Sequence, residues 1–432
     1  MTNQSLIARD LDVIWHPCTQ MKDHETLPLI PIQSAKGVYL HDFEGNSYID
    51  AISSWWVNIL GHSHPRINQR IKDQIDKLDH VLLAGFSHES AIELAEKLVE
   101  ISPEGLEKVF FADNGSSGIE VALKMSFHYH KNRGKNKPLF VSLTNSYHGE
   151  TMGALAVGDV ELYKETYNEI LIQSIQTSVP KDQSEAAALE AIVEAEKLFA
   201  EQHEHISAII IEPLVQCAGL MHMYHPIFVT KLRELCDRYD IHLIADEVAT
   251  GFGRTGTLFA IEQSGVSPDF MVLSKGLTGG YMALSTVLTT NEVYQAFYCD
   301  YLELKAFLHS HSYTGNPIAC SAANATIDIL RDEHIIEKNQ EKIAYIKKQT
   351  ERFKSLEKVK SVRQTGMICA IELSGYTFED RVGIRVYQYA LKHGVLLRPL
   401  GHVIYFMPPY TITLEEIDMM IEVAYLGIVS LE

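Results

Sequence analysis

Short, almost continuous apolar runs alternate with amphipathic stretches through the middle of the chain. The apolar runs predict strands at residues 107–113, 139–145, 206–214, 241–248 and 269–275. Between them, apolar residues recur with helical spacing over residues 117–132 and 226–240. Strands that are apolar on both faces and alternate with helices are typical of a mainly parallel sheet covered on both sides. We therefore predict a large α/β domain over residues 60–325.

The two ends of the chain have a different pattern. Residues 36–51 ("KGVYLHDFEGNSYIDA") predict a β-hairpin that turns at Glu44-Gly45-Asn46. A long charged helix is expected over residues 327–356, and strand-like segments follow it. We expect residues 1–59 and 326–432 to combine into a smaller α+β domain.

Composition narrows the possible partners and compartment. The chain carries a net charge of −19 without a long basic block, which argues against nucleic acids and anionic membranes as partners. Its apolar runs are far shorter than the roughly 20 residues that a membrane-spanning helix needs. Residues 1–15 lack a basic start followed by an apolar core, so we expect no signal peptide. The six cysteines have no paired spacing, which favours reduced thiols in the cytoplasm over disulfides or a metal site.

Two segments that follow predicted strands could contact a cofactor. Gly115 and Ser116 lie between a strand and a helix, where backbone N–H groups and the helix dipole favour a phosphate. The same turn is also typical of an ordinary helix cap by Asn114, Ser116 or Ser117. Tyr147 follows the next strand, so its ring could lie on a bound heteroaromatic ring or simply at the edge of the core.

Asp246 and Glu247 close a strongly apolar strand. These carboxylates either pair with a cation or take part in chemistry, or they face solvent where the strand ends. Downstream, Gly251, Gly253 and Gly256 match the G-x-G-x-x-G pattern of dinucleotide-binding proteins. That fingerprint needs the glycines directly between a strand and a helix, and this segment lacks both neighbours at the required positions. The pattern therefore does not predict a nicotinamide site.

Lys275 ends the last of these strands, in the segment "LSKGLTGG". A P-loop requires a glycine directly before the lysine, and Leu273-Ser274 stand there instead. A structural salt bridge remains open. Pyridoxal phosphate, however, needs a phosphate turn, a ring partner, a carboxylate at its pyridine nitrogen and a lysine for a Schiff base, and the strand ends offer these in that order. Burial and nearby cations would lower the pKa of such a lysine and make its neutral amine a nucleophile.

A family resemblance is carried by the segments "IIIEPLVQ", "LIADEVATGFGRTG", "LSKGLTGG" and "HSYTGNP". With them, and over nearly its whole length, the chain resembles the class III (ω-amino acid) aminotransferases of PLP fold type I. The resemblance implies a large α/β domain with a mainly parallel sheet, a smaller α+β domain, and ping-pong amino transfer with pyridoxal 5′-phosphate.

The ends of the chain carry a narrower resemblance. The segments "IWHPCTQMKD", "SSWWVNILGHSHP", "HVLLAGFSHE" and "LLRPLGHVIYFMPPY" are similar to the 7,8-diaminopelargonic acid synthases of biotin biosynthesis. These enzymes transfer an amino group to 8-amino-7-oxononanoate, usually from S-adenosylmethionine. The Trp55-Trp56 pair is more specific for this group than the glycine segments, which class III members share.

The resemblance also implies a role for each candidate residue. The cofactor-binding residues that it implies are Gly115, Ser116, Tyr147, Asp246, Lys275, His311 and Ser312. Among them, Lys275 would form the Schiff base, Asp246 would hold the pyridine nitrogen, and Tyr147 would stack on the ring. Residues 310–312 would reach the phosphate of a neighbouring subunit, which implies a homodimer with shared sites.

Substrate contacts follow from the same resemblance. The substrate-binding residues that it implies are Cys18, Trp55, Trp56, Tyr147, Arg254, Lys275, Ser310, Arg398 and Tyr405. Arg398 would bind the acceptor's carboxylate, for which a guanidinium is well matched. Trp55 would line the pocket for the aliphatic chain, although a tryptophan pair is also typical of a domain core. Glu212 resembles the acid that bonds Arg254 in relatives.

Cys18 departs from the family, whose well-known members have a tyrosine there. A thiol offers neither a ring face nor a phenolic hydroxyl, so the donor stays open between S-adenosylmethionine, which we favour, and lysine. Other acceptors of the acetylornithine, ornithine or γ-aminobutyrate type are further alternatives. A nicotinamide-dependent dehydrogenase would rest on the glycine pattern alone, and a pyridoxal phosphate-binding protein without catalysis would have to keep an intact site unused.

Overall fold

The computed structural model describes residues 2–377 and 379–431. The chain divides into two compact units, each described by itself below. The large unit comprises Arg66–Ile343 and Gln364–Ile368, and the small unit comprises Met1–Pro65, Ala344–Arg363 and Cys369–Glu432.

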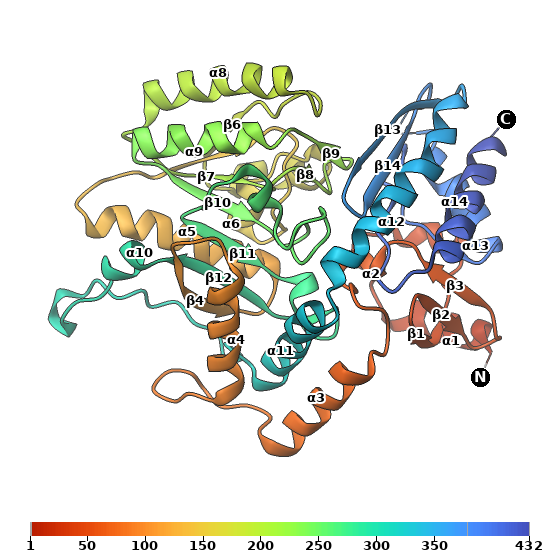
Figure 1. The fold of residues 1–432 in the computed structure, drawn as a ribbon, viewed down its shortest axis with the longest axis horizontal. Coiled ribbons are helices and arrows are strands. Elements are labelled where there is room, and N and C mark those ends of the chain that lie inside the picture. The colour runs from red at the N-terminus through yellow and green to blue at the C-terminus, as the bar shows by residue number, and fades with distance from the viewer. Residues whose placement is uncertain (1, 378, 432) are drawn as a thin grey trace. The chain divides into compact units, whose positions relative to one another are not determined.

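The large unit is built around a sheet with strand order β4-β12-β11-β10-β7-β5-β6 (Figure 1). Its strands are β4 (Leu106–Ala112), β5 (Leu139–Leu143), β6 (Ser174–Thr177), β7 (Ile206–Ile211), β10 (His242–Asp246), β11 (Phe270–Leu273) and β12 (Ser285–Thr290). Strand β12 runs antiparallel to both β11 and β4, while the pairs from β11 across to β6 are parallel. The predicted mainly parallel sheet is therefore confirmed. The sequence pattern did not single out β12.

Helices cover this sheet. Helix α5 (Gly115–Asn132) packs against β4, β7, β10, β11 and β12, and helices α8 (Glu185–Gln202) and α9 (Ile227–Tyr239) pack side by side (Figure 1). The other helices here are α3 (Pro65–Lys77), α4 (Glu89–Ile101), α6 (Met152–Ala156), α7 (Glu161–Lys164), α10 (Asn291–Gln295) and α11 (Pro317–Asp332). Strands β8 (Val215–Gln216) and β9 (His222–Met223) form a separate antiparallel pair.

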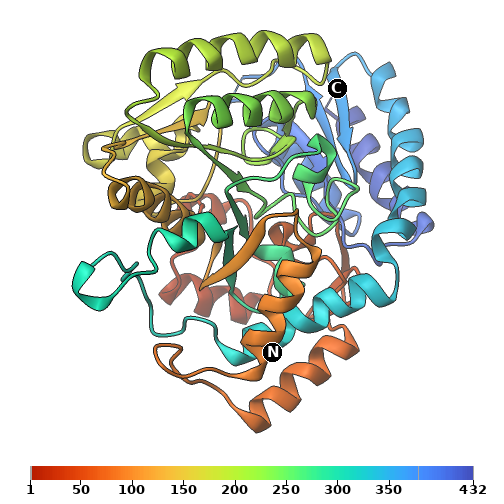
Figure 2. The same cartoon turned by 60° about the vertical axis from the view of Figure 1, so that its left-hand side comes forward.

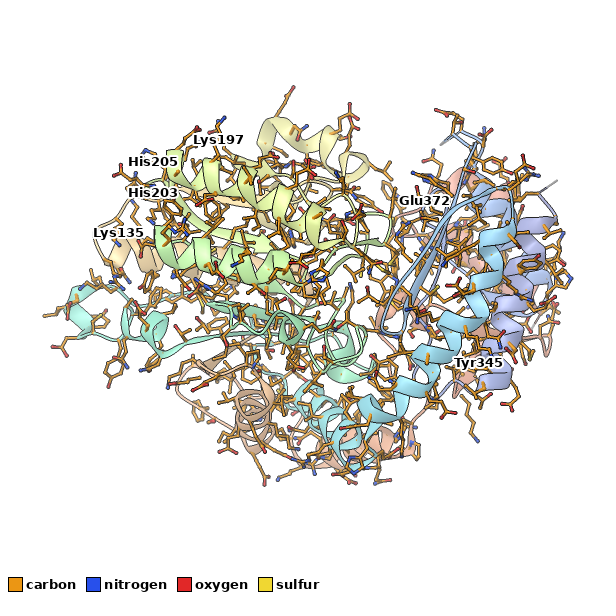
Figure 3. All side chains as sticks on the ribbon, turned by 45° about the horizontal axis from the view of Figure 1, so that its top comes forward. Lys135, Lys197, His203, His205, Tyr345 and Glu372 are labelled. Atoms are coloured by element: carbon orange, nitrogen blue, oxygen red, sulfur yellow. The ribbon has the colours of Figure 1, made fainter. Side chains whose placement is uncertain are left out.

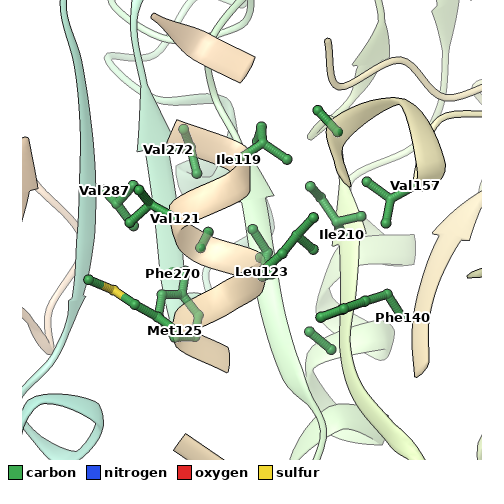
Figure 4. Close-up of a cluster of buried hydrophobic side chains, with 14 of the residues drawn as sticks. Ile119, Val121, Leu123, Met125, Phe140, Val157, Ile210, Phe270, Val272 and Val287 are labelled. Carbon is green, nitrogen blue, oxygen red and sulfur yellow. The ribbon is translucent and has the colours of Figure 1, made fainter. Parts of the chain in front are cut away.

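The core of the large unit lies between α5 and the strands. Apolar side chains of α5 interlock with side chains of β5, β7, β11 and β12 (Figure 4). Gly118 makes the close approach possible, because a Cβ at this position would lie 2.7 Å from Val272 Cγ1. The tight packing of α5 fixes the position of its N-terminus relative to the strand ends.

One predicted helix proved to be two. Residues 327–356 were expected to form a single helix, but α11 ends at Asp332 and α12 (Ile335–Thr350) starts after a break. His334 lies at the break with a φ of +50°, a left-handed conformation that a continuous right-handed helix does not accommodate. Helix α11 packs on α4 and on the turn after β11, so the large unit continues past the expected boundary at residue 325 to Ile343.

The small unit contains strands from both chain ends. One sheet has the order β1 (Ile32–Lys36), β2 (Tyr39–Asp42), β3 (Ser47–Asp50), β15 (Val395–Leu396), and β3 and β15 pair in parallel. A second sheet has the order β13 (Val359–Thr365), β14 (Ile368–Leu373), β16 (Val403–Phe406). The helices are α1 (Asn3–Val13), α2 (Ser53–Trp56), α13 (Val382–Lys392) and α14 (Leu414–Val429).

The expected hairpin joins β2 to β3. Gly45 takes a φ of +88° in its turn, and the buried Asp42 accepts hydrogen bonds from the N–H groups of Glu44 and Asn46 at 2.9 and 2.8 Å. These bonds fix the turn where the sequence placed it.

Both units contain ion pairs, and Figure 3 labels one member of a pair in each unit, Glu372 and Lys135. Glu372 on β14 pairs with Lys360 at 2.7 Å and Arg363 at 2.6 Å, which lowers the pKa of its carboxyl to about 2 although burial opposes the shift. In the large unit, Lys135 pairs with Asp240 at 2.7 Å. Among the described residues, none of the helices combines the length and the apolar character needed to cross a bilayer.

Candidate active site

The candidate residues of the large unit meet at one edge of its sheet. Strands β4, β5, β7, β10 and β11 share one direction, so their carboxyl ends lie along the same edge. At the ends of these strands, or within four residues after them, lie Gly115, Tyr147, Glu212, Asp246 and Lys275. In open α/β sheets this edge is where ligands bind.

Asp246 is buried and paired with a histidine that the sequence reasoning missed. His148 Nδ1 lies 2.8 Å from Asp246 Oδ2, and the N–H of Val248 donates to Asp246 Oδ1 at 3.1 Å. The buried His148 Nε2 has no hydrogen-bond partner among the described residues. Asp246 therefore offers a fixed carboxylate in a dry setting, which suits the charged nitrogen of a heteroaromatic ring. The histidine next to Tyr147 in "SYHG" was the available signal.

Glu212 connects two turns at the same edge. Its Oε1 accepts from the N–H of Tyr147 at 3.0 Å and its Oε2 accepts from the N–H of Cys217 at 3.0 Å. Burial raises the pKa of the carboxyl to about 7, with His148 opposing and Asp246 adding to the rise. Glu212 thereby fixes the backbone that presents the Tyr147 ring. The expected partner Arg254 is also buried, and its charge acts on Lys275.

Lys275 begins the short 3-10 helix η4 (Lys275–Thr278) with a φ of +45°. Ser274 fixes the end of β11, because its Oγ donates to Leu284 O at 2.7 Å. Lys275 as a whole is only partly buried, but its amine lies deep enough that burial lowers its pKa, against the charges of Cys217, Asp246 and Glu212. A lowered pKa makes the neutral, nucleophilic amine accessible near neutral pH.

The turn before α5 is compatible with both interpretations drawn from the sequence, a helix cap and a phosphate site. Asn114 caps the helix, since its Oδ1 accepts from the N–H of Ser117 at 3.0 Å. The N–H groups of Gly115 and Ser116 have no acceptor among the hydrogen bonds of the described residues. Helix N-termini of this kind bind anions. The capped turn therefore still fits a phosphate.

Two glycines allow this turn to pack closely against neighbouring segments. A Cβ on Gly115 would lie 2.9 Å from Val248 Cγ1. Gly149 has a φ of +120°, and a Cβ there would collide with the side chain of Ser116, reaching its Cβ at 2.7 Å. The segment Tyr147–Gly149 therefore lies directly against the first turn of α5.

The G-x-G-x-x-G segment is a buried loop. Residues 251–258 form turns, and the element that follows is the short 3-10 helix η3 (Ala260–Ser264). Glu247 holds this loop, accepting from Thr250 Oγ1 at 2.6 Å and from the N–H of Ile261 at 2.7 Å, while burial raises its pKa to about 7. The dinucleotide fingerprint is thus absent from the described segment. Asp246 and Glu247 are both buried, so the solvent-facing interpretation of the pair is wrong.

Residues 310–312 lie in the loop before α11. Ser310 and Ser312 are exposed, and the N–H of His311 donates to Thr314 Oγ1 at 3.3 Å. Their expected role toward a neighbouring subunit stays a prediction.

The two tryptophans of the small unit have different surroundings. Trp56 is buried, with its Nε1 donating to Tyr405 OH at 3.0 Å, as a core interpretation predicts. The Trp55 side chain is 39% exposed, and the Arg398 guanidinium lies over its ring at 4.3 Å from the centroid. Both Trp55 and Arg398 line a cavity of about 350 Å³ within this unit. Cys18 is exposed and has a φ of +50°.

Comparisons with known proteins agree with this geometry. The family model described as Aminotransferase class-III matches residues 20–425. The chain is 50% identical over 421 residues to the adenosylmethionine-8-amino-7-oxononanoate aminotransferase of Helicobacter pylori, covering 96% of this chain and 95% of that protein.

Solved structures are also similar. The adenosylmethionine-8-amino-7-oxononanoate aminotransferase of Methanocaldococcus jannaschii matches with a TM-score of 0.96 and 36% identity, covering 99% of each chain. The ω-transaminase of Pseudomonas jessenii in complex with PMP matches with a TM-score of 0.93 and 29% identity, covering 98% of each chain.

The family match covers most of the chain, and the strand-end lysine, carboxylate, aromatic ring and anion-binding turn are the groups that pyridoxal phosphate requires. The chain belongs to the class III aminotransferases, and its cofactor is pyridoxal 5′-phosphate.

Proposed function

We propose that this chain transfers an amino group from S-adenosylmethionine to 8-amino-7-oxononanoate, forming the 7,8-diamino acid of biotin biosynthesis. The observation that carries the proposal is the similarity, along the whole chain, to proteins named for this donor and this acceptor. A cytoplasmic location is proposed with it, because the six cysteines of the sequence lack the paired spacing of a disulfide framework.

The cofactor is held by the strand-end residues. The N–H groups of Gly115 and Ser116 would bind its phosphate, and the Tyr147 ring would stack on its ring. Asp246, oriented by His148 at 2.8 Å, would keep a proton on the pyridine nitrogen. Lys275 would provide the amine that bonds the aldehyde carbon. These roles are supported by the burial and contacts of each group.

The bound cofactor supplies an electron sink for the charge left on carbon when a proton is removed. Lys275 Nζ takes that proton from the amine-bearing carbon of the donor. In the second half-reaction the same amine returns a proton to the former ketone carbon of the acceptor. The cofactor would hold the amino group between the two half-reactions, so the deaminated donor leaves before the acceptor binds, which is ping-pong kinetics.

Acceptor binding is assigned to the small unit. The Arg398 guanidinium can hold the acceptor's terminal carboxylate with two parallel hydrogen bonds. Trp55 lies against Arg398 at 4.3 Å and presents an apolar face for the aliphatic chain. Trp56 and Tyr405 are buried in the core of the same unit, where a hydrogen bond of 3.0 Å joins them.

Lysine is the alternative donor. Cys18 takes the place of the tyrosine that the family resemblance leads us to expect. A thiol lacks the hydroxyl and the ring of a tyrosine. Arg254, buried beside the cluster of Lys275 and Glu212, is assigned to the donor pocket.

A homodimer is the proposed assembly. The segment between α10 and α11 extends away from the body of the large unit (Figures 1 and 2). Its exposed apolar side chains include Leu302, 87% exposed, and Leu308, 93% exposed. Such clustered apolar exposure marks an interaction surface. The segment runs directly into residues 310–312, so a second copy of this chain seated on it would receive those residues at its phosphate site.

Gly149→Ala tests the proposed phosphate site at Gly115 and Ser116. The added methyl group meets Ser116 and the φ of +120° disfavours alanine, so the variant should bind pyridoxal phosphate at least about tenfold more weakly. Fluorescence titration of the apoenzyme with the cofactor measures this. Gly134→Ala is the matched control, because Gly134 also has a positive φ, of +76°, but no atom within 4 Å of an added Cβ. Equal affinity of both variants for pyridoxal phosphate would contradict the proposed phosphate site.

The donor is tested by half-reactions. The holoenzyme is mixed separately with S-adenosylmethionine, lysine, ornithine and γ-aminobutyrate, and the visible absorbance of the bound cofactor is followed. We expect S-adenosylmethionine to convert it. Conversion by lysine but not by S-adenosylmethionine would reassign the donor, conversion by ornithine alone would also reassign the pathway, and no conversion by any amine would contradict transamination.

The dimer is tested with Leu308→Asp in light scattering coupled to size-exclusion chromatography. A charge in the apolar contact should shift the mass from dimer toward monomer. Val193→Asp is the control, because Val193 is a 67% exposed apolar residue on α8, outside the segment. A dimer of unchanged stability in Leu308→Asp would rule out this surface.

A further inference from the structure

The segment between β3 and Val57 has an uncommon backbone conformation. Ser53, Ser54, Trp55 and Trp56 have successive φ angles of +52°, +46°, +72° and +74°. They therefore form one left-handed turn, labelled α2 (Ser53–Trp56). A left-handed conformation costs about 1–2 kcal/mol for each residue with a side chain. Strain of this kind persists only where surrounding contacts enforce it, and it concentrates at binding sites.

A buried carboxylate enforces the turn. Asp50, at the end of β3, accepts from the N–H of Ser54 at 2.9 Å and from Ser54 Oγ at 2.7 Å. His62 adds a third bond, with its Nε2 at 2.9 Å from Asp50 Oδ2. Asn58 Nδ2 lies 3.0 Å from His62 Nδ1, so Nδ1 accepts and Nε2 carries the proton that His62 donates.

A second anchor fixes the start of the turn. Ser53 Oγ donates to Met407 O at 2.7 Å. With Asp50 on one side and the backbone after β16 on the other, the turn is tied to two sheets of the small unit. Hydrogen bonds to a buried charge are among the stronger ones in a protein, so Asp50 is the main restraint.

The turn decides where the two tryptophans point. In this turn Trp56 lies in the core against Tyr405, and Trp55 lies on Arg398, 4.3 Å from guanidinium carbon to ring centroid. Trp55 and Arg398 line the cavity of about 350 Å³ together with apolar side chains such as Leu29, Ile30 and Leu396. This volume is in the range of small-molecule pockets.

We propose that Asp50 and Ser54 are positioning residues for the acceptor: they hold the left-handed turn that keeps Trp55 against Arg398, and so pre-aim the guanidinium at the carboxylate of a long-chain amino keto acid. The inference rests on the proposed function. A cation held on an aromatic face loses less freedom when it binds a carboxylate, so the turn raises affinity without contacting the ligand itself.

Ser54→Ala tests the proposal, since Ser54 is exposed and its substitution leaves the core intact. We expect the KM for 8-amino-7-oxononanoate to rise about tenfold, as for a lost hydrogen bond to a buried charge, with kcat and the donor half-reaction within about twofold of the unmodified enzyme. Asp50→Asn should raise KM further, because an amide nitrogen cannot accept from His62 or Ser54. Calorimetric titration with the acceptor and with its methyl ester measures binding apart from turnover.

Ser63→Ala is the matched control. Ser63 also has a left-handed φ, of +56°, and its Oγ donates to Ala35 O at 2.8 Å, outside the turn. Its KM should not change. The positioning role would be overturned if the KM of Ser54→Ala were unchanged. It would also be overturned if the rates of the donor and acceptor half-reactions fell by equal factors. An unmodified enzyme that neither binds nor aminates the acceptor would instead overturn the proposed function.

Discussion

The shared direction of β4, β5, β7, β10 and β11 is the constraint on which the site depends. It brings the N-terminal turn of α5, an aromatic ring, two carboxylates and a lysine from distant parts of the sequence to one edge of a sheet. None of these groups is close to the others along the chain, apart from neighbours within a turn. The packing of α5 on the strands, with Gly118 against Val272, fixes the position of that turn.

Burial then determines the chemistry. Charged groups are costly in a dry environment unless they are paired, and here Asp246 is paired with His148 at 2.8 Å. Glu212, whose pKa burial raises to about 7, carries its proton below that pH and loses it above. Lys275 has its pKa lowered by the same burial, so its amine is more readily neutral, as its proposed role of nucleophile and proton carrier requires. Strand ends thus supply both the position and the reactivity of the groups.

Much of this could be predicted from the sequence, because continuous apolar runs identify buried strands and the residue after such a run must lie at the sheet edge. Asp246 and Lys275 were found in this way, and the family resemblance added Trp55 and Arg398. His148 was missed because its pairing with Asp246 joins residues that are far apart in sequence. The antiparallel β12 and the break at His334 depend on tertiary packing, which local patterns do not contain. The left-handed turn at Ser53–Trp56 was also invisible, because it exists only through the bonds of Asp50 and Met407.

The central claim is that Lys275 is the lysine bonded to the cofactor. Borohydride reduction of the holoenzyme fixes that bond, and peptide mass spectrometry then locates it. The mass of the reduced cofactor should appear on the peptide that contains Lys275. Lys137 is the informative competitor, because it too is buried with a lowered pKa but pairs with Asp240 at 3.1 Å on another part of the large unit. Modification of Lys137 or of any lysine other than Lys275 would contradict the account.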